Sequence, residues 1–119
     1  MTVGIGQQLV QAISSQDEAA IAACFAQDAE LHALVPRGLR ERSGAADIGS
    51  LIAGWFGDSS ELDLVESRVE DVGDKLHVAY RFEGVEEGEP YVVEQHVFCT
   101  LAGEQIARAD LVCSGFRPR

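Results

Sequence analysis

The longest regular alternation of apolar and polar residues lies near the C-terminus, in the runs Tyr91–Leu101 and Gln105–Cys113. Ala102-Gly103-Glu104 separates them and supplies a glycine for a turn. Alternation with a glycine-containing turn is typical of an antiparallel hairpin. Because both faces of this hairpin contain apolar residues, we expect helices to cover one face and a second copy of the protein to cover part of the other.

The preceding stretch continues the same pattern. Leu62–Val72 and Lys75–Gly84 are predicted to be strands joined by a turn at Gly73-Asp74, and an acidic turn connects the second of them to the long hairpin. The C-terminal half is therefore predicted to be an antiparallel meander.

The N-terminal half has helical periodicity instead. Apolar residues fall on one side of a helix over residues 3–14, and Asp17 is placed to cap a second helix that ends near Gln27-Asp28. A third helix is expected between Ser43 and Gly57, with an apolar stripe that would lie on the sheet.

A short strand over residues 30–35 and the stretch Pro36–Arg42 lie between the second and third helices. Pro36 is expected to end the strand, and the stretch after it carries three arginines, Arg37, Arg40 and Arg42, in a predicted loop. They can bind an anion or simply be solvated, and we favour solvated loop arginines.

Composition narrows the class of protein. A chain of 119 residues with 46% apolar residues is the size of one domain, so we expect a single domain spanning residues 1–119. A net charge of −11 disfavours nucleic acid and anionic lipid as partners. Three cysteines without a CxxC pair fit a reducing compartment, so we expect a cytoplasmic protein with neither export signal nor membrane span.

Three short motifs in this order resemble the nuclear-transport-factor-2-like superfamily, which includes ketosteroid isomerases and SnoaL-type polyketide cyclases. They are the junction Cys24–His32, the helix opening Ser43–Ile48, and the hairpin turn Ala102–Ile106. The resemblance implies an α+β fold, in which a cone-shaped, curved antiparallel sheet wraps around N-terminal helices. Such a fold hosts many functions.

The functional residues of these relatives do not carry over to this chain. By matching, the carboxylate that moves the proton in the isomerases falls at Ala33, and the oxyanion-binding tyrosine falls near Leu9. The isomerases' protonated aspartate falls near His96, and the acid of the cyclases falls near Cys113. We therefore expect no ketosteroid isomerase activity, because no base is present to take the proton.

The resemblance and the alternation together predict a mostly apolar pocket for a small molecule of apolar or mixed polarity. The residues expected to line it are Trp55, Phe56, Tyr80, Phe82, Val92, Glu94, His96, Phe98 and Cys113. His96 is the candidate general acid or base, with Glu94 two residues away on the same strand face. A hydrogen-bonded core histidine is the alternative, and we favour it over catalysis.

His32 is a further candidate, although its side chain is expected on the face opposite Ala33. The three histidines, His32, His77 and His96, have no HxH or HExxH spacing, so no metal site is predicted. The sequence indicates no cofactor.

Two functions remain open: a small-molecule pocket protein, either a binding protein or an isomerase, cyclase or hydrolase with unassigned chemistry, and a non-enzymatic dimerisation or interaction module with a closed core. Under either function we expect a homodimer. Its interface would use the hairpin face that carries Tyr91, Val93, Val97 and Leu101.

Overall fold

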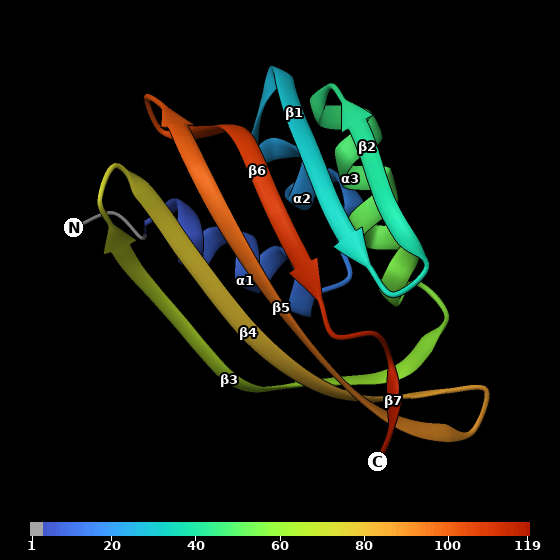
Figure 1. The fold of residues 1–119 in the computed structure, drawn as a ribbon. Helices are drawn as coiled ribbons and strands as arrows, with labels where there is room; N and C mark the ends of the chain where they lie inside the picture. The colour runs from blue at the N-terminus through green and yellow to red at the C-terminus, as the bar shows by residue number, and fades with distance from the viewer. Residues whose placement is uncertain (1–3) are drawn as a thin grey trace.

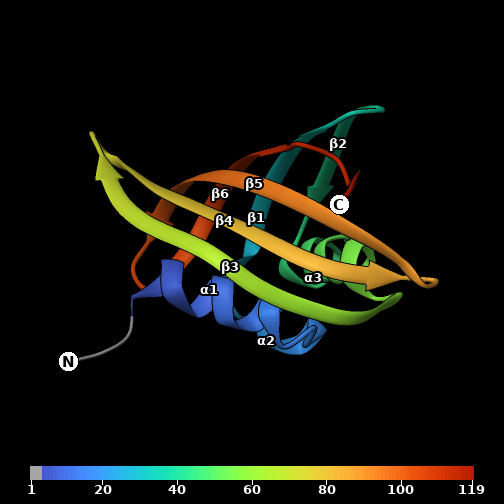
Figure 2. The same ribbon diagram turned by 90° about the horizontal axis from the view of Figure 1, so that it is seen from below.

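The structure is a computed structural model that describes residues 4–119. Helices cover the concave side of a curved sheet, which arches over them in Figure 2. In chain order the elements are α1 (Ile5–Ser14), α2 (Glu18–Ala23), β1 (Phe25–Val35), β2 (Gly38–Ser43), α3 (Ala45–Phe56), β3 (Ser59–Val72), β4 (Lys75–Glu86), β5 (Glu89–Ala102), β6 (Gln105–Cys113) and β7 (Arg117–Pro118).

The strands form one sheet in the order β2-β1-β6-β5-β4-β3, and the short β7 pairs with β5 (Figure 1). β1 and β2 pair antiparallel, as do the successive strands from β3 to β6, whereas β1 and β6 pair in parallel. This confirms the predicted α+β fold with a curved sheet around N-terminal helices, and it adds one parallel pairing. No helix of residues 4–119 is long and apolar enough to cross a membrane.

The first half of the chain departs from the predicted boundaries. The second helix is capped as expected, because the Ala20 N–H donates to Asp17 Oδ1 at 3.1 Å, but it ends at Ala23 instead of Gln27-Asp28. The following strand begins at Phe25, because Phe25 and Ala29 are buried against the helices. The predicted loop Pro36–Arg42 is wrong for most of its length, since β2 pairs with β1 from Gly38 onward.

The register between β4 and β5 decides which of their residues face the helices. A two-residue turn joins β4 to β5, and both of its residues, Glu87 and Gly88, have positive φ. This conformation is the one favoured for tight hairpins. It pairs Tyr80 with Gln95 and Phe82 with Val93. Even-numbered residues of β4 therefore share a face with odd-numbered residues of β5.

The predicted pocket set is wrong in this respect. Phe56, Tyr80 and Phe82 are buried in the core, but Glu94, His96 and Phe98 lie on the other face of the sheet. The sequence pattern shows alternation within each strand. It does not show the register between strands, which the turn length sets.

The same register buries most of the surface that was predicted to form the homodimer interface. Tyr91, Val93 and Val97 are buried inside the protein against the helices, with exposed fractions of 5%, 1% and 1%, and only Leu101 is exposed. The helices cover this face because α1 and α3 both pack on the concave side of the sheet. The homodimer itself stays a prediction.

Candidate ligand site

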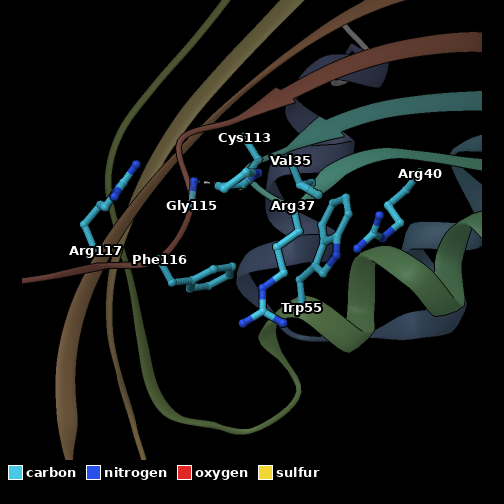
Figure 3. Close-up of a pocket in the computed structure, with 9 residues that line it drawn as sticks. Val35, Arg37, Arg40, Trp55, Cys113, Gly115, Phe116 and Arg117 are labelled. Carbon is cyan, nitrogen blue, oxygen red and sulfur yellow. Dashed lines mark hydrogen bonds between the residues drawn. The ribbon is translucent and has the colours of Figure 1, made fainter.

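A cavity of about 440 Å³ lies at the open end of the sheet, beside the C-terminal part of α3. Four segments that are far apart in the sequence build it: the end of β1 with its turn, β2, the last turn of α3, and the chain after β6 (Figure 3). The lining residues are Val35, Pro36, Arg37, Arg40, Trp55, Cys113, Gly115, Phe116 and Arg117.

The chain after β6 reaches the cavity because of a close approach between two turns. Gly115 has φ +84°, and a Cβ at this position would come within 2.7 Å of Pro36 Cγ. Only glycine fits both constraints without displacing Pro36. The next residue, Phe116, then packs edge-to-face on Phe56 and Tyr91 with ring centroids 5.6 Å and 5.0 Å apart, and forms one wall of the cavity.

A buried polar chain leads from the core to the edge of the cavity. The Tyr80 hydroxyl donates to Gln95 Oε1 at 2.6 Å, and Gln95 Nε2 donates to Cys113 Sγ at 3.3 Å. The Gly115 N–H also donates to Cys113 Sγ, at 3.4 Å. Burial raises the pKa of Tyr80, so the phenol stays protonated and acts as a donor. The Cys113 thiol is thus held in place by two N–H donors.

The cavity contains part of the predicted site. Of the residues predicted to line a pocket, Trp55 and Cys113 line this cavity, whereas Phe56, Tyr80 and Phe82 form the core behind it. Sequence reasoning missed Phe116 and Gln95. The one available signal for Gln95 was its position as the polar residue on an otherwise apolar face of β5.

Three arginines line the cavity: Arg37, Arg40 and Arg117. Figure 3 shows Arg37 and Arg40 on the two sides of Trp55, and Arg117 beyond Phe116. The Arg117 Nε donates to the backbone oxygen of Ser114 at 3.1 Å, which anchors that side chain at the rim. Arg37 and Arg40 belong to the stretch Pro36–Arg42, whose arginines were predicted from the sequence to be solvated.

His96 and Glu94 occupy the outer face of the sheet. Glu94 Oε1 accepts from Arg81 Nη2 at 2.7 Å, and Glu94 Oε2 lies 2.8 Å from His96 Nε2. On the other side of the ring, His96 Nδ1 lies 2.9 Å from His77 Nε2, and His77 stacks on Phe98 with ring centroids 4.5 Å apart. His96 therefore belongs to a hydrogen-bonded network on the outer face of the sheet. It does not line the cavity beside Trp55.

The electrostatics of this outer network are those of a salt bridge. The hydrogen bond from His96, and then the one from Arg81, lower the pKa of Glu94. Glu94 in turn raises the pKa of Arg81. Both groups are consequently held in their charged forms by each other.

The remaining candidates lie elsewhere. His32 is on the outer face, as expected, with Nδ1 3.5 Å from Arg108 Nη2. Cys24 is a core residue, and burial raises its pKa to about 11. Within residues 4–119, no three His, Cys, Asp or Glu side chains are grouped so that they could hold a metal ion.

A model of the SnoaL-like domain family matches residues 7–109. The chain belongs to the SnoaL-like family. The match spans α1 to β6 and includes most of the elements that surround the cavity, although the C-terminal wall at Gly115–Arg117 follows it. No curated protein matches this SnoaL-like chain.

Solved structures share the fold of this SnoaL-like protein. A protein with a ketosteroid isomerase-like fold from Catenulispora acidiphila, solved in complex with trimethylamine, has a TM-score of 0.76 at 18% identity, covering 93% of this chain and 85% of that one. A candidate polyketide cyclase from Xanthomonas campestris has a TM-score of 0.72 at 22% identity, covering 91% and 86%. An NTF2-like protein from Burkholderia thailandensis has a TM-score of 0.72 at 16% identity, covering 95% and 92%.

Proposed function

We propose that this SnoaL-like protein binds a small molecule of apolar or mixed polarity in the cavity beside Trp55. The observation that carries the proposal is the cavity itself, whose volume of about 440 Å³ lies within the range typical of small-molecule sites. Val35, Trp55 and Phe116 give it apolar walls, and three arginines and the Cys113 thiol supply its polar groups. Family membership supports the same function.

Other hollows on the surface are less suited to this role. One of about 580 Å³ lies between α2 and the start of α3, and one of about 630 Å³ lies beside the beginning of α1. Neither has a tryptophan, a cysteine or an arginine in its lining. A hollow of about 400 Å³ on the outer face includes His96, Glu94 and two arginines in its lining, but no tryptophan or cysteine. Of these four hollows in residues 4–119, the cavity beside Trp55 is the one that combines aromatic walls with a thiol and fixed charges.

As an enzyme of the isomerase, cyclase or hydrolase class, the protein would need a catalytic group other than the carboxylate of the ketosteroid isomerases. Ala33 and Leu9, which match the isomerase base and tyrosine, are both buried apolar residues. The lining of the cavity includes no carboxylate, and its one nucleophilic group is the Cys113 thiol. The described lining therefore provides no carboxylate that could abstract a proton from a ligand.

Trp55 makes the proposal directly testable, because it is the one tryptophan of the chain. We expect the neutral aryl alcohol 4-phenylbutanol to change Trp55 fluorescence saturably and to raise the melting temperature, since a compound that binds only the folded state stabilises it. Val35→Phe, which fills the cavity from β1, should weaken binding by about tenfold or more, which corresponds to roughly 1.4 kcal/mol.

Val72→Phe is the matched control. It makes the same chemical change on β3, where Val72 has an exposed fraction of 49% and does not line the cavity. Its affinity should equal that of the wild type. Equal weakening in both variants, or no fluorescence response at any concentration, would remove the cavity as the binding site.

The competing function, a dimerisation or interaction module, has one observation in its favour. Leu34, Phe98 and Val112 expose apolar surface on three adjacent strands of the outer face. Sedimentation of the wild type and of Val112→Asp at micromolar concentration tests this: a dimer that Val112→Asp dissociates would favour the module, and a wild-type monomer would exclude homodimerisation through this face.

A further inference from the structure

Four of the eight arginines in this protein are paired with a carboxylate. The chain has 20 acidic residues against nine basic ones, so partners are plentiful. Arg68, Arg81, Arg108 and Arg119 each have a carboxylate oxygen within 4.0 Å, the tightest being Glu94 at 2.7 Å from Arg81. Within residues 4–119 the other four, Arg37, Arg40, Arg42 and Arg117, have no such partner.

Three of these four unpaired arginines lie at the cavity. Within residues 4–119, Arg37, Arg40 and Arg117 have no ion pair with a carboxylate, and all three line the cavity beside Trp55. No Asp or Glu contributes to that lining. Three like charges beside an apolar cavity repel one another unless a counter-ion neutralises them. Although the net charge of the protein is −11, the lining of this cavity carries positive charge and no carboxylate.

The arrangement around Trp55 indicates how a ligand would lie. Arg37 and Arg40 flank the indole, while Phe116 closes the cavity on the other side (Figure 3). Guanidinium groups present planar pairs of N–H donors that match the two oxygens of a carboxylate, and aromatic rings provide surface for an apolar body.

We propose that the ligand of this cavity is an organic carboxylate, whose charged end binds Arg37 and Arg40 and whose apolar body packs between Trp55 and Phe116. This inference rests on the proposed function, since it names the chemical class that the same cavity binds. It places the ligand's charge beside Trp55, away from Arg117 at the rim (Figure 3). A cationic ligand would face three guanidinium groups without a compensating carboxylate in the lining.

The test compares two probes with the same carbon skeleton, 4-phenylbutanoate and 4-phenylbutanol, by titration of Trp55 fluorescence at pH 7. The wild type should bind the carboxylate at least tenfold more tightly than the alcohol. In the double variant Arg37→Gln/Arg40→Gln, this preference should fall to about twofold or less, because the charged hydrogen-bond donors are gone. Binding of the alcohol should change little.

Arg42→Gln is the matched control. Arg42 is also on β2, is exposed, and directs Nη1 to the backbone oxygen of Glu41 instead of the cavity. It changes the net charge of the protein without touching the site, so the preference for the carboxylate should persist. Melting temperatures of all variants should match the wild type, because none of these arginines is in the core.

The possible outcomes separate the two proposals. Equal affinity for both probes in the wild type, or an equal loss of preference in Arg42→Gln, would overturn the carboxylate assignment while leaving a small-molecule cavity. No response of Trp55 to either probe would overturn the cavity as a ligand site, and the carboxylate assignment with it.

Discussion

The two faces of the sheet use polar groups in opposite ways. On the outer face, Arg81, Glu94, His96 and His77 form a continuous chain in which each side chain has a partner in its neighbour. On the inner face, polar groups are few, and at the open end the arginines of the cavity have no carboxylate partner in the described chain. A side chain whose hydrogen bonds are already made within the protein has few donors or acceptors free for a ligand. An arginine without a carboxylate partner beside an apolar cavity has its donors free to bind one.

The comparison changes the choice of functional residues. His96 and Glu94 were candidates because a histidine and a carboxylate on one strand face are typical of acid–base chemistry. Their hydrogen bonds instead account for them as a surface network. The unpartnered arginines lie in a stretch where sequence alone favours solvation, and only the fold brings them beside Trp55.

The largest expected effect contrasts one phenylalanine from each face. Phe82→Ala removes a fully buried ring that packs edge-to-face on Phe56 and Tyr80, and should lower the free energy of unfolding by about 3–5 kcal/mol. Phe98→Ala on the outer face, where 37% of the residue is exposed, should cost about 1 kcal/mol. Urea denaturation of both variants measures this, and equal losses would contradict the register of β4 and β5.

Gln95 tests the polar chain of the inner face. Gln95→Leu removes the acceptor of the buried Tyr80 hydroxyl and should cost about 1–3 kcal/mol, the range for stranding a buried polar group. The double variant Tyr80→Phe/Gln95→Leu removes both partners and should recover part of this loss, with a coupling energy of at least about 0.5 kcal/mol in a double-mutant cycle. Additive losses would show that the hydrogen bond contributes nothing.

His96→Leu addresses the outer network. The side chain is 34% exposed, and Glu94 keeps its hydrogen bonds from Arg81 after the change, so we expect a loss of about 1 kcal/mol or less. The Trp55 response to 4-phenylbutanol should be that of the wild type. A lost response in a folded variant would return His96 to the ligand site.

The smallest effect is a pH dependence at Glu94. Its pKa is lowered in the folded protein, chiefly by His96 and then by Arg81, relative to about 4.3 in an unfolded chain. The resulting stabilisation is present above that pH and is lost as the pH falls through the folded-state pKa. Glu94→Gln should therefore be slightly less stable than the wild type at pH 7, and the difference should close below about pH 4. A difference that grows on acidification, measured by urea denaturation, would contradict this sign.

Local patterns in the sequence were sufficient for the fold class and for the order of the elements other than β2 and β7. Helical periodicity before Gly57, the Asp17 cap and strand alternation after Leu62 depend on neighbouring residues alone, and the α+β fold follows from them together with the resemblance. Trp55 and Cys113 were predicted from the sequence to line a pocket, but one that also contained His96 and Glu94, which lie outside this cavity.

The tertiary structure decided which face each side chain of β5 occupies and where the functional charges meet. A shift of one residue in the turn between β4 and β5 would exchange the two faces, and an acidic stretch with one glycine does not specify the turn length by itself. The parallel pairing of β1 with β6 joins strands about 80 residues apart, and it brings Pro36 and Arg37 to Gly115 and Phe116. Because the contact between these two turns depends on packing between distant segments, no local periodicity in the sequence predicts it.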